Sequence, residues 1–241
     1  MTPETLATPM IALAVPIVVA AVLGALGRWL RPVAPWLALA GPLALAGIGA
    51  DSIAGERYGG MSWQWISAGA TTIDAGFAIF PLSALMLAVV GVVAAMVVLF
   101  SAGYMRGDRG YARYFALLSL FTAAMAALVM ADSLVTLFIG WELVGACSFL
   151  LIGFWYEKPA AAEAARKAFL VTRVGDVFFL LGIAVLWVST GTVRITEVLA
   201  TVPALPAATV TAAALLLFAG AAGKSAQFPL HVWLPDAMEG P

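Results

Sequence analysis

The chain has 241 residues, of which 63% are hydrophobic and only 10% are charged, and its mean hydropathy is +1.04. A soluble domain of this size keeps roughly a quarter to a third of the surface of its unfolded chain in contact with water, and cannot bury this much apolar surface. The formal net charge is −1 and the twelve Lys and Arg residues are scattered, which excludes a basic nucleic-acid-binding surface. The composition therefore predicts an integral membrane protein that binds no nucleic acid.

Stretches of about 20 apolar residues predict an all-α fold, a polytopic bundle of about seven transmembrane helices. The predicted spans cover roughly residues 9–30, 33–50, 77–104, 114–131, 134–155, 168–188 and 210–233. Two polar segments are predicted as loops. One is an extracytoplasmic loop at about 51–76, where Trp63 and Trp65 suit a membrane interface, and the other is an alanine-rich loop at 157–167.

The seventh span is predicted to be a discontinuous helix. The clearly apolar run from Val210 to Ala222 is too short to cross a bilayer, and it is followed by GKSAQ and then by an apolar run that contains Pro229 and Pro235. Interrupted helices at membrane depth are tolerated where they line a cavity or are buried in protein, and in transporters they mark ion sites. We therefore expect Lys224 to lie at or near the break.

Loop charges predict the orientation. The loops after the first, third and fifth spans carry Arg28, Arg31, Arg106, Arg109, Arg113, Lys158, Arg166 and Lys167. The opposite side carries only Arg57 and Arg194. By the positive-inside rule, the first group faces the cytoplasm and the N-terminus is extracytoplasmic. Glu4 precedes the first apolar run without any Lys or Arg, unlike a signal peptide, so we expect the first span to be retained.

Four ionisable residues lie inside predicted spans, where a central charge costs roughly 2.5–3.5 kcal/mol on insertion scales. They are Glu142 in the fifth span, Arg173 and Asp176 in the sixth, and Lys224 in the seventh. Arg173 and Asp176 are three residues apart, so they share a helix face and can form an intrahelical clamp. Glu142 and Lys224 have no local partner, which favours a direct pair across a helix interface or positions beside a water-filled cavity.

A pair of Glu142 and Lys224 could act as a proton switch. A low dielectric favours the neutral form of a lysine amine, whereas a nearby carboxylate favours the charged form, so separating the two would release a proton. A static ion pair that fixes helix register is the alternative. His231 lies seven residues after Lys224, close to two turns if the helix resumes, and is either a proton relay or an interfacial residue.

Other kinds of site are not supported. One His and one Cys cannot form a zinc, haem or iron–sulfur site by the usual ligand sets, and no nucleotide-binding glycine motif stands at a strand-to-helix junction. Cys147 is the only cysteine, so it is expected to be a small buried hydrophobe. We therefore expect the chain to hold no cofactor or metal and to perform no redox chemistry by itself.

Three motifs resemble a known family. They are GWELVGACSFLLIGFWY at 140–156, KAFLVTRVGD at 167–176 and GKSAQFPLHVWLPDAMEGP at 223–241. Together they resemble subunit L of bacterial NADH-quinone oxidoreductase, which is respiratory complex I, and its mitochondrial counterpart, subunit 5. The similarity covers most of residues 77–241.

The resemblance implies a non-redox subunit that moves protons while partner subunits of the enzyme oxidise NADH and reduce quinone. It implies roles on the proton path for Glu142, Lys224 and His231. It also implies that Arg173 and Asp176, besides forming a clamp, tune this path.

The resemblance further implies a domain organisation. Residues 1–114 would hold the first three helices, and residues 115–241 would hold helices four to seven, an incomplete first half of the antiporter-like proton-transfer module. Because the family continues far beyond Pro241, we expect a fragment or the product of a split gene. The implied partners are the other complex I subunits, above all the neighbouring antiporter-like subunit, and the lipids of a bacterial plasma membrane. NADH, flavin, iron–sulfur clusters and quinone would belong to those partner subunits.

Other functions stay open at the level of sequence, including those of the related membrane subunits of hydrogenases and of inorganic-carbon uptake systems. The chain could be a subunit of an Mrp-type cation/proton antiporter, which needs no redox partner. It could also be a membrane scaffold whose ion pairs only fix helix packing.

Overall fold

The computed structural model of the chain describes residues 3–68 and 71–241. Most of them are helical, and the others form one two-stranded sheet, turns and loops. The elements in chain order are α1 (Pro3–Leu30), η1 (Arg31–Val33), α2 (Ala34–Ala38), α3 (Ala40–Ala54), β1 (Gly59–Ala68), β2 (Thr71–Ile79), α4 (Pro81–Tyr104), α5 (Tyr111–Val129), α6 (Leu134–Ile152), α7 (Pro159–Thr190), α8 (Ile195–Thr201), η2 (Val202–Ala204), α9 (Ala207–Lys224) and η3 (Asp236–Glu239).

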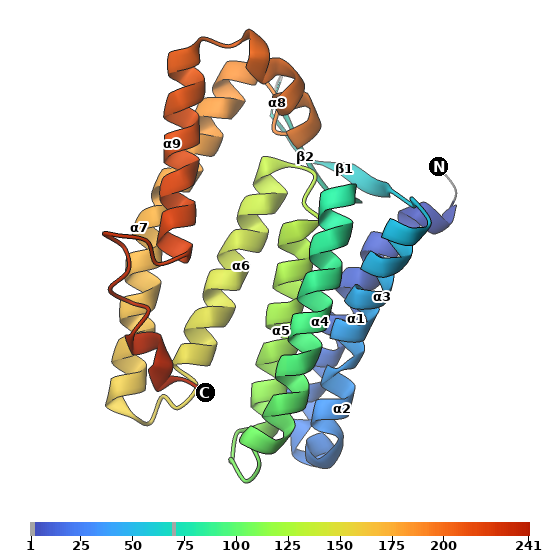
Figure 1. Cartoon of the computed structure of the whole chain (residues 1–241), viewed down its shortest axis with the longest axis vertical. Helices are drawn as coiled ribbons and strands as arrows, with labels where there is room; N and C mark the ends of the chain where they lie inside the picture. Colours follow the sequence, from blue (N-terminus) through green and yellow to red (C-terminus); the bar gives the residue numbers. More distant parts are fainter. Residues whose placement is uncertain (1–2, 69–70) are drawn as a thin grey trace. The chain divides into compact units, whose positions relative to one another are not determined.

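The chain divides into two compact units. The first is formed by residues 1–61 and 76–131, and the second by residues 62–75 and 132–241. Helices α1 to α5 belong to the first unit and α6 to α9 to the second, while β1 and β2 each have residues in both (Figure 1).

The helical membrane fold is confirmed. Six segments of the described residues are long and apolar enough to cross a membrane, and the first of them, Thr8–Ala54, contains most of α1 and all of α3. When these two helices are counted separately, the seven predicted spans correspond to α1, α3, α4, α5, α6, α7 and α9.

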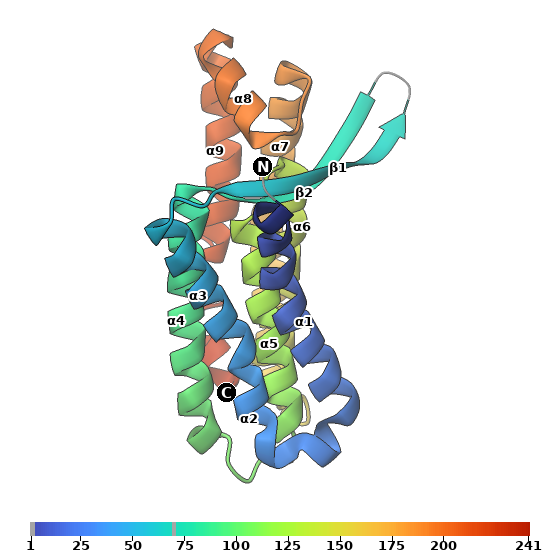
Figure 2. The same cartoon turned by 90° about the vertical axis from the view of Figure 1, so that its right-hand side faces the viewer.

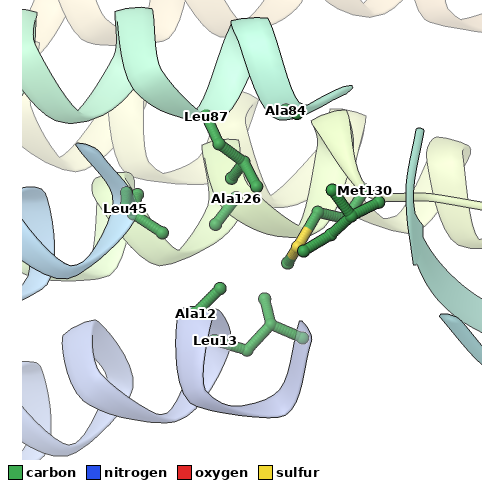
Figure 3. Packing of buried hydrophobic residues seen from close by; sticks show 8 residues of the cluster. Ala12, Leu13, Leu45, Ala84, Leu87, Ala126 and Met130 are labelled. Carbon is green, nitrogen blue, oxygen red and sulfur yellow. The ribbon is translucent and has the colours of Figure 1, made fainter. Parts of the chain in front are cut away.

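In the first unit, α1 packs on α5 and α3 packs on α4 (Figure 2). Side chains from all four helices meet in its core (Figure 3). This core consists of Ala12, Leu13, Leu45, Ile79, Ala84, Leu87, Ala126 and Met130. Helices α3 and α4 approach closely at Gly49 and Gly91, where a Cβ would lie 2.5 and 2.4 Å from backbone nitrogens of the opposite helix.

The loops after α1 and α4 lie at the same end of the first unit. Nη2 of Arg31 donates a hydrogen bond to the carbonyl oxygen of Asp108 at 2.7 Å. The guanidinium of Arg31 also lies 5.9 Å from the ring centroid of Tyr111. This arrangement agrees with the prediction, made from the positive charges of both loops, that the two loops lie on the same side of the membrane.

The predicted loop at 157–167 is wrong for most of its length, because residues 159–167 form the first turns of α7. This helix starts at Pro159 and is 32 residues long. Alanine has the highest helix propensity, and proline is favoured at the first helical position, so the segment PAAAEAARKA favours a helix. With a rise of 1.5 Å per residue, α7 is about 48 Å long, and its charged first turns therefore extend beyond a hydrocarbon core of about 30 Å.

The predicted loop at 51–76 contains regular structure as well. Helix α3 continues to Ala54, and β1 and β2 follow, with residues 69 and 70 outside the described part of the chain. Aromatic and β-branched residues favour strands, which explains this difference. Trp63 and Trp65 are both exposed and, two residues apart on β1, lie on one face of the strand. Their place at a membrane interface stays a prediction.

In the second unit, α7 packs on both α6 and α9 (Figure 1). An apolar core joins α6, α7, α8 and α9. It consists of Leu134, Phe179, Ile183, Leu186, Val198 and Ala213. The helical part of the seventh span is longer than predicted, since α9 covers 18 residues from Ala207 to Lys224 and is by itself long enough to cross.

The chain beyond α9 is not helical in the way the sequence predicted. The break falls at Lys224, as expected, but turns follow it up to the short 3-10 helix η3. Nε1 of Trp233 donates a hydrogen bond to the carbonyl oxygen of Gly223 at 3.1 Å, and Nζ of Lys167 pairs with Asp236 at 2.6 Å. These contacts fold the segment back onto the first turns of α7, and the prolines explain why no regular helix resumes.

A corner of the second unit links the start of α6 to the start of α8. The amide of Ile195 donates to the carbonyl oxygen of Asp132 at 3.0 Å. The side chain of Asp132 is buried, and its Oδ1 has no hydrogen-bond partner among the described residues. Burial raises the pKa of the Asp132 carboxyl above its ordinary value of 3.8, Asp74 raises it further, and Arg194 and a backbone hydrogen bond oppose the rise.

This raised pKa predicts a pH-dependent stability. Between pH 4 and the raised pKa, the folded chain binds more protons than the unfolded chain, so the free energy of unfolding falls as the pH rises through this window. Each unit by which the pKa is raised corresponds to about 1.4 kcal/mol. Asp132→Asn should therefore stabilise the chain relative to wild type more at pH 8 than at pH 4.5, as measured by thermal unfolding of the membrane complex. Glu163→Gln, at an exposed position on α7, is the control. A gap between wild type and Asp132→Asn that is equal at both pH values would contradict the prediction.

Candidate functional site

The four intramembrane charges lie together in the second unit, on three helices. Glu142 lies near the middle of α6, Arg173 and Asp176 lie on α7, and Lys224 is the last residue of α9. Two acids and two bases give the cluster a net formal charge of zero, which reduces the cost of placing it in a membrane.

Arg173 connects the two carboxylates. Its Nη1 forms an ion pair with Oε2 of Glu142, and the same atom lies 3.5 Å from Oδ2 of Asp176. The guanidinium also lies 4.5 Å from the ring centroid of Phe169, one turn earlier on α7. Arg173 can therefore shift between two acids without leaving its place on the helix.

Asp176 is the most buried of the four, with 2% of its side chain exposed. Its Oδ1 accepts a hydrogen bond of 2.5 Å from Nε1 of Trp141 on α6. Its Oδ2 has no hydrogen bond in the described part of the chain and faces two cations, at 3.5 Å from Arg173 and 4.0 Å from Nζ of Lys224. Both distances are longer than a hydrogen bond, so the contacts are electrostatic.

The side chain of Lys224 ends between α6 and α7, near Trp141, Gly145 and Asp176. Its Nζ is buried and donates no hydrogen bond to any described residue. It lies 5.7 Å from the ring centroid of Trp141, and a Cβ on Gly145 would lie only 2.6 Å from it. Gly145 therefore leaves the space that the ammonium group occupies, one turn along α6 from Glu142.

The cluster brings together the four predicted charged residues, but only one of the two predicted pairs forms. The expected intrahelical contact between Arg173 and Asp176 is present. The expected direct pair of Glu142 with Lys224 is not what the structure shows, because Glu142 pairs with Arg173 and the carboxylate next to Lys224 is that of Asp176. Helical spacing predicts partners on one helix, whereas these two contacts cross between helices.

The helix that would place His231 two turns beyond Lys224 does not form. The two-turn spacing requires a helix between them, and this segment consists of turns. His231 is exposed, and its ring lies 5.6 Å from that of Phe228. Its role on a proton path stays a prediction.

Two residues of the site were missed by the sequence reasoning, Trp141 and Gly145. Gly145 shares a face of α6 with Trp141, four residues earlier, and with Glu142, three residues earlier. A tryptophan directly before an intramembrane glutamate was the available signal, because a buried indole N–H needs an acceptor.

Comparisons with known proteins agree with this arrangement. Two family models match: "NADH:quinone oxidoreductase/Mrp antiporter, TM" over residues 131–241, and "NADH-Ubiquinone oxidoreductase (complex I), chain 5 N-terminus" over residues 65–115. The first match contains all four charges of the cluster.

Similar curated proteins come from several kinds of organism. NAD(P)H-quinone oxidoreductase chain 5 of Synechocystis sp. is 48% identical over 197 residues, which cover 79% of this chain and 29% of that protein. F(420)H(2) dehydrogenase subunit L of Methanosarcina mazei is 52% identical over 182 residues, which cover 67% of this chain and 27% of that protein. The chain thus spans less than a third of the length of these relatives.

Solved structures share the fold. A chain of the Mrp complex from Dietzia sp. DQ12-45-1b superposes with a TM-score of 0.84 at 32% identity, covering 97% of this chain and 25% of that one. A chain of the membrane-bound sulfane sulfur reductase, an archaeal respiratory membrane complex, superposes with a TM-score of 0.77 at 22% identity. The match covers 95% of this chain and 47% of that one, and at this identity it supports a shared fold only. On these matches, the chain belongs to the family of antiporter-like membrane subunits that NADH:quinone oxidoreductases share with Mrp antiporters.

Proposed function

We propose that the chain is a proton-translocating subunit of a membrane NADH-quinone oxidoreductase, and that Lys224 is its proton carrier. The observation that carries this proposal is the shared carboxylate of Asp176, whose Oδ2 faces both Lys224 and Arg173. A lysine amine binds and releases a proton according to the charges around it. The site therefore contains a carrier, Lys224, and a competitor for its counter-ion, Arg173.

The mechanism depends on which acid holds Arg173. While Arg173 pairs with Glu142, Asp176 is free to stabilise the ammonium form of Lys224. When Arg173 moves toward Asp176, from which it is 3.5 Å away, the lysine loses part of this stabilisation and releases its proton. Two unit charges 4 Å apart interact by about 4 kcal/mol at an effective dielectric constant of about 20, so this competition is strong enough to change the protonation of Lys224.

The driving motion comes from partner subunits. The relatives are named for different electron donors, NAD(P)H in one case and F(420)H(2) in another, although they are similar to the same chain. This supports a subunit that receives a conformational or electrostatic change and carries no electrons. NADH, flavin, iron–sulfur clusters and quinone then belong to partner subunits. We place the chain in a bacterial plasma membrane, with its N-terminus extracytoplasmic, beside another antiporter-like subunit.

The test uses the assembled complex in membrane vesicles. Lys224→Ala and Glu142→Gln should each reduce the number of protons moved per electron pair, because the first removes the carrier and the second releases Arg173 to compete for Asp176. Arg166→Ala is the matched control, since Arg166 is an exposed cation on the same helix as Arg173. Full proton translocation in both variants of an assembled complex would overturn the proposal.

A second candidate is a cation/proton antiporter subunit, and the likeness to a chain of the Mrp complex favours it. The identities of 48% and 52% to oxidoreductase subunits, over 79% and 67% of this chain, favour the first candidate. Vesicles that contain the natural complex separate the two functions. An antiporter dissipates an imposed pH gradient when Na⁺ or K⁺ is added, without any electron donor, whereas the proposed subunit builds a gradient only during electron transfer.

A further inference from the structure

Trp141 makes two contacts with α7 that fix its ring. Its indole lies nearly parallel to the ring of Phe179, with centroids 4.5 Å apart and an interplanar angle of 11°. Its Nε1 donates the 2.5 Å hydrogen bond to Asp176, which is three residues from Phe179 and on the same face of α7. The stacking contact sets the plane of the indole, and the hydrogen bond sets the direction of its N–H group.

The hydrogen bond determines which oxygen of Asp176 faces the cations. An indole N–H can only donate, so Oδ1 of Asp176 is occupied by a partner that carries no charge. This leaves Oδ2 turned toward Arg173 and Lys224. Rotation of the carboxylate about its bond to Cβ would break the hydrogen bond to Trp141. A residue of α6 therefore fixes the orientation of this α7 carboxylate.

Helix α6 thus holds both members of the α7 pair through neighbouring residues. Glu142 contacts Arg173, and Trp141 contacts Asp176. Adjacent residues point about 100° apart around a helix, so these two side chains reach α7 on either side of the α6–α7 contact line. A displacement of α6 along or around α7 changes both contacts at once.

We propose that Trp141 is a positioning residue for the proton transfer, which holds Asp176 so that one oxygen stays between Arg173 and Lys224. This inference rests on the proposed function of Lys224 as proton carrier. It adds that α6 influences both partners in the competition for Asp176. Glu142 contacts Arg173, and Trp141 contacts Asp176 itself.

The experiment removes the N–H group and keeps the ring. Trp141→Phe retains an aromatic face for Phe179, and the benzothienyl analogue of tryptophan at position 141 retains the full shape while replacing N–H by sulfur. Trp187→Phe on α7, three turns beyond Asp176, is the matched control. In the assembled complex, proton translocation and electron transfer are measured between pH 6 and 9. Difference infrared spectroscopy follows the carboxylate bands of Asp176, which are assigned as the bands that Asp176→Asn loses.

We expect both position-141 variants to slow proton translocation about tenfold, because a hydrogen bond to a charged group contributes such a factor or more to an equilibrium. We also expect a shifted pH profile and a shifted Asp176 band, which a purely structural role would not produce.

If both variants match Trp187→Phe in all three measurements while Lys224→Ala stops translocation, the inference about Trp141 is wrong and the proposed function stands. If Lys224→Ala translocates protons normally, the proposed function itself is wrong. Should Trp141→Phe fail to assemble, the benzothienyl variant decides, since its shape is unchanged.

Discussion

Asp176→Asn is expected to reduce proton translocation more than Glu142→Gln does. Asp176 is 2% exposed and contacts Trp141, Arg173 and Lys224, so its neutralisation leaves a buried lysine without its nearest counter-ion. Breaking a buried pair by removing one partner costs about 3–5 kcal/mol. In Glu142→Gln, by contrast, Arg173 keeps Asp176 as a partner at 3.5 Å. We therefore expect a loss of at least about tenfold for Asp176→Asn, with a smaller loss for Glu142→Gln.

The order of the two effects distinguishes the observed pairing from a direct pair of Glu142 with Lys224. If Glu142 were the counter-ion of the lysine, its neutralisation would have the larger effect. The measurement is the initial rate of proton translocation in inverted vesicles, divided by the rate of electron transfer. Asp236→Asn serves as the control, because it removes the same charge from an exposed ion pair with Lys167 in the same unit. Equal losses in Asp176→Asn and Asp236→Asn would contradict the role given to Asp176.

The fold was largely predictable because helices in a bilayer must satisfy their own backbone hydrogen bonds. Hydropathy then gives their number and approximate bounds, and the break at Lys224 was predicted from the residues that follow it. The errors lie where hydropathy carries no information. The first turns of α7 are polar and therefore resembled a loop, although alanine-rich sequences favour helices. Most of the hairpin of β1 and β2 lies outside the predicted apolar spans, and residues 77–79 of β2 fall at the start of the predicted third span.

The site was predictable as a set of residues and not as a set of pairs. An intramembrane charge is expensive, so each of Glu142, Arg173, Asp176 and Lys224 stands out in the sequence. Their partners depend on how α6, α7 and α9 are rotated against one another, and this rotation is determined by packing. The stacking of Trp141 on Phe179 is an example, since nothing in the sequence pairs these two aromatic residues.

Gly220→Ala is expected to disturb the site through packing alone. A Cβ at Gly220 would lie 2.6 Å from Cβ of Phe179, an atom fixed close to the backbone of α7. The two helices would have to separate, and overpacking of this kind costs about 1–3 kcal/mol. Lys224 lies one turn further along α9, and Phe179 is the residue on which Trp141 stacks. The substitution should therefore lower the thermal stability of the complex and also reduce proton translocation.

A glycine without neighbours provides the control for this prediction. No heavy atom lies within 4 Å of a Cβ at Gly24 in α1, so Gly24→Ala adds a methyl group without a clash. Alanine is favoured over glycine in a helix interior by about 1 kcal/mol, and Gly24→Ala should be neutral or slightly stabilising. Gly220→Ala could instead behave like Gly24→Ala, both in the thermal unfolding of the complex and in proton translocation. That result would show that the tight contact of α7 with α9 does not determine the distance from Lys224 to Asp176. If only Gly220→Ala loses both properties, the spacing of these two helices determines which protonation state of the lysine is stable.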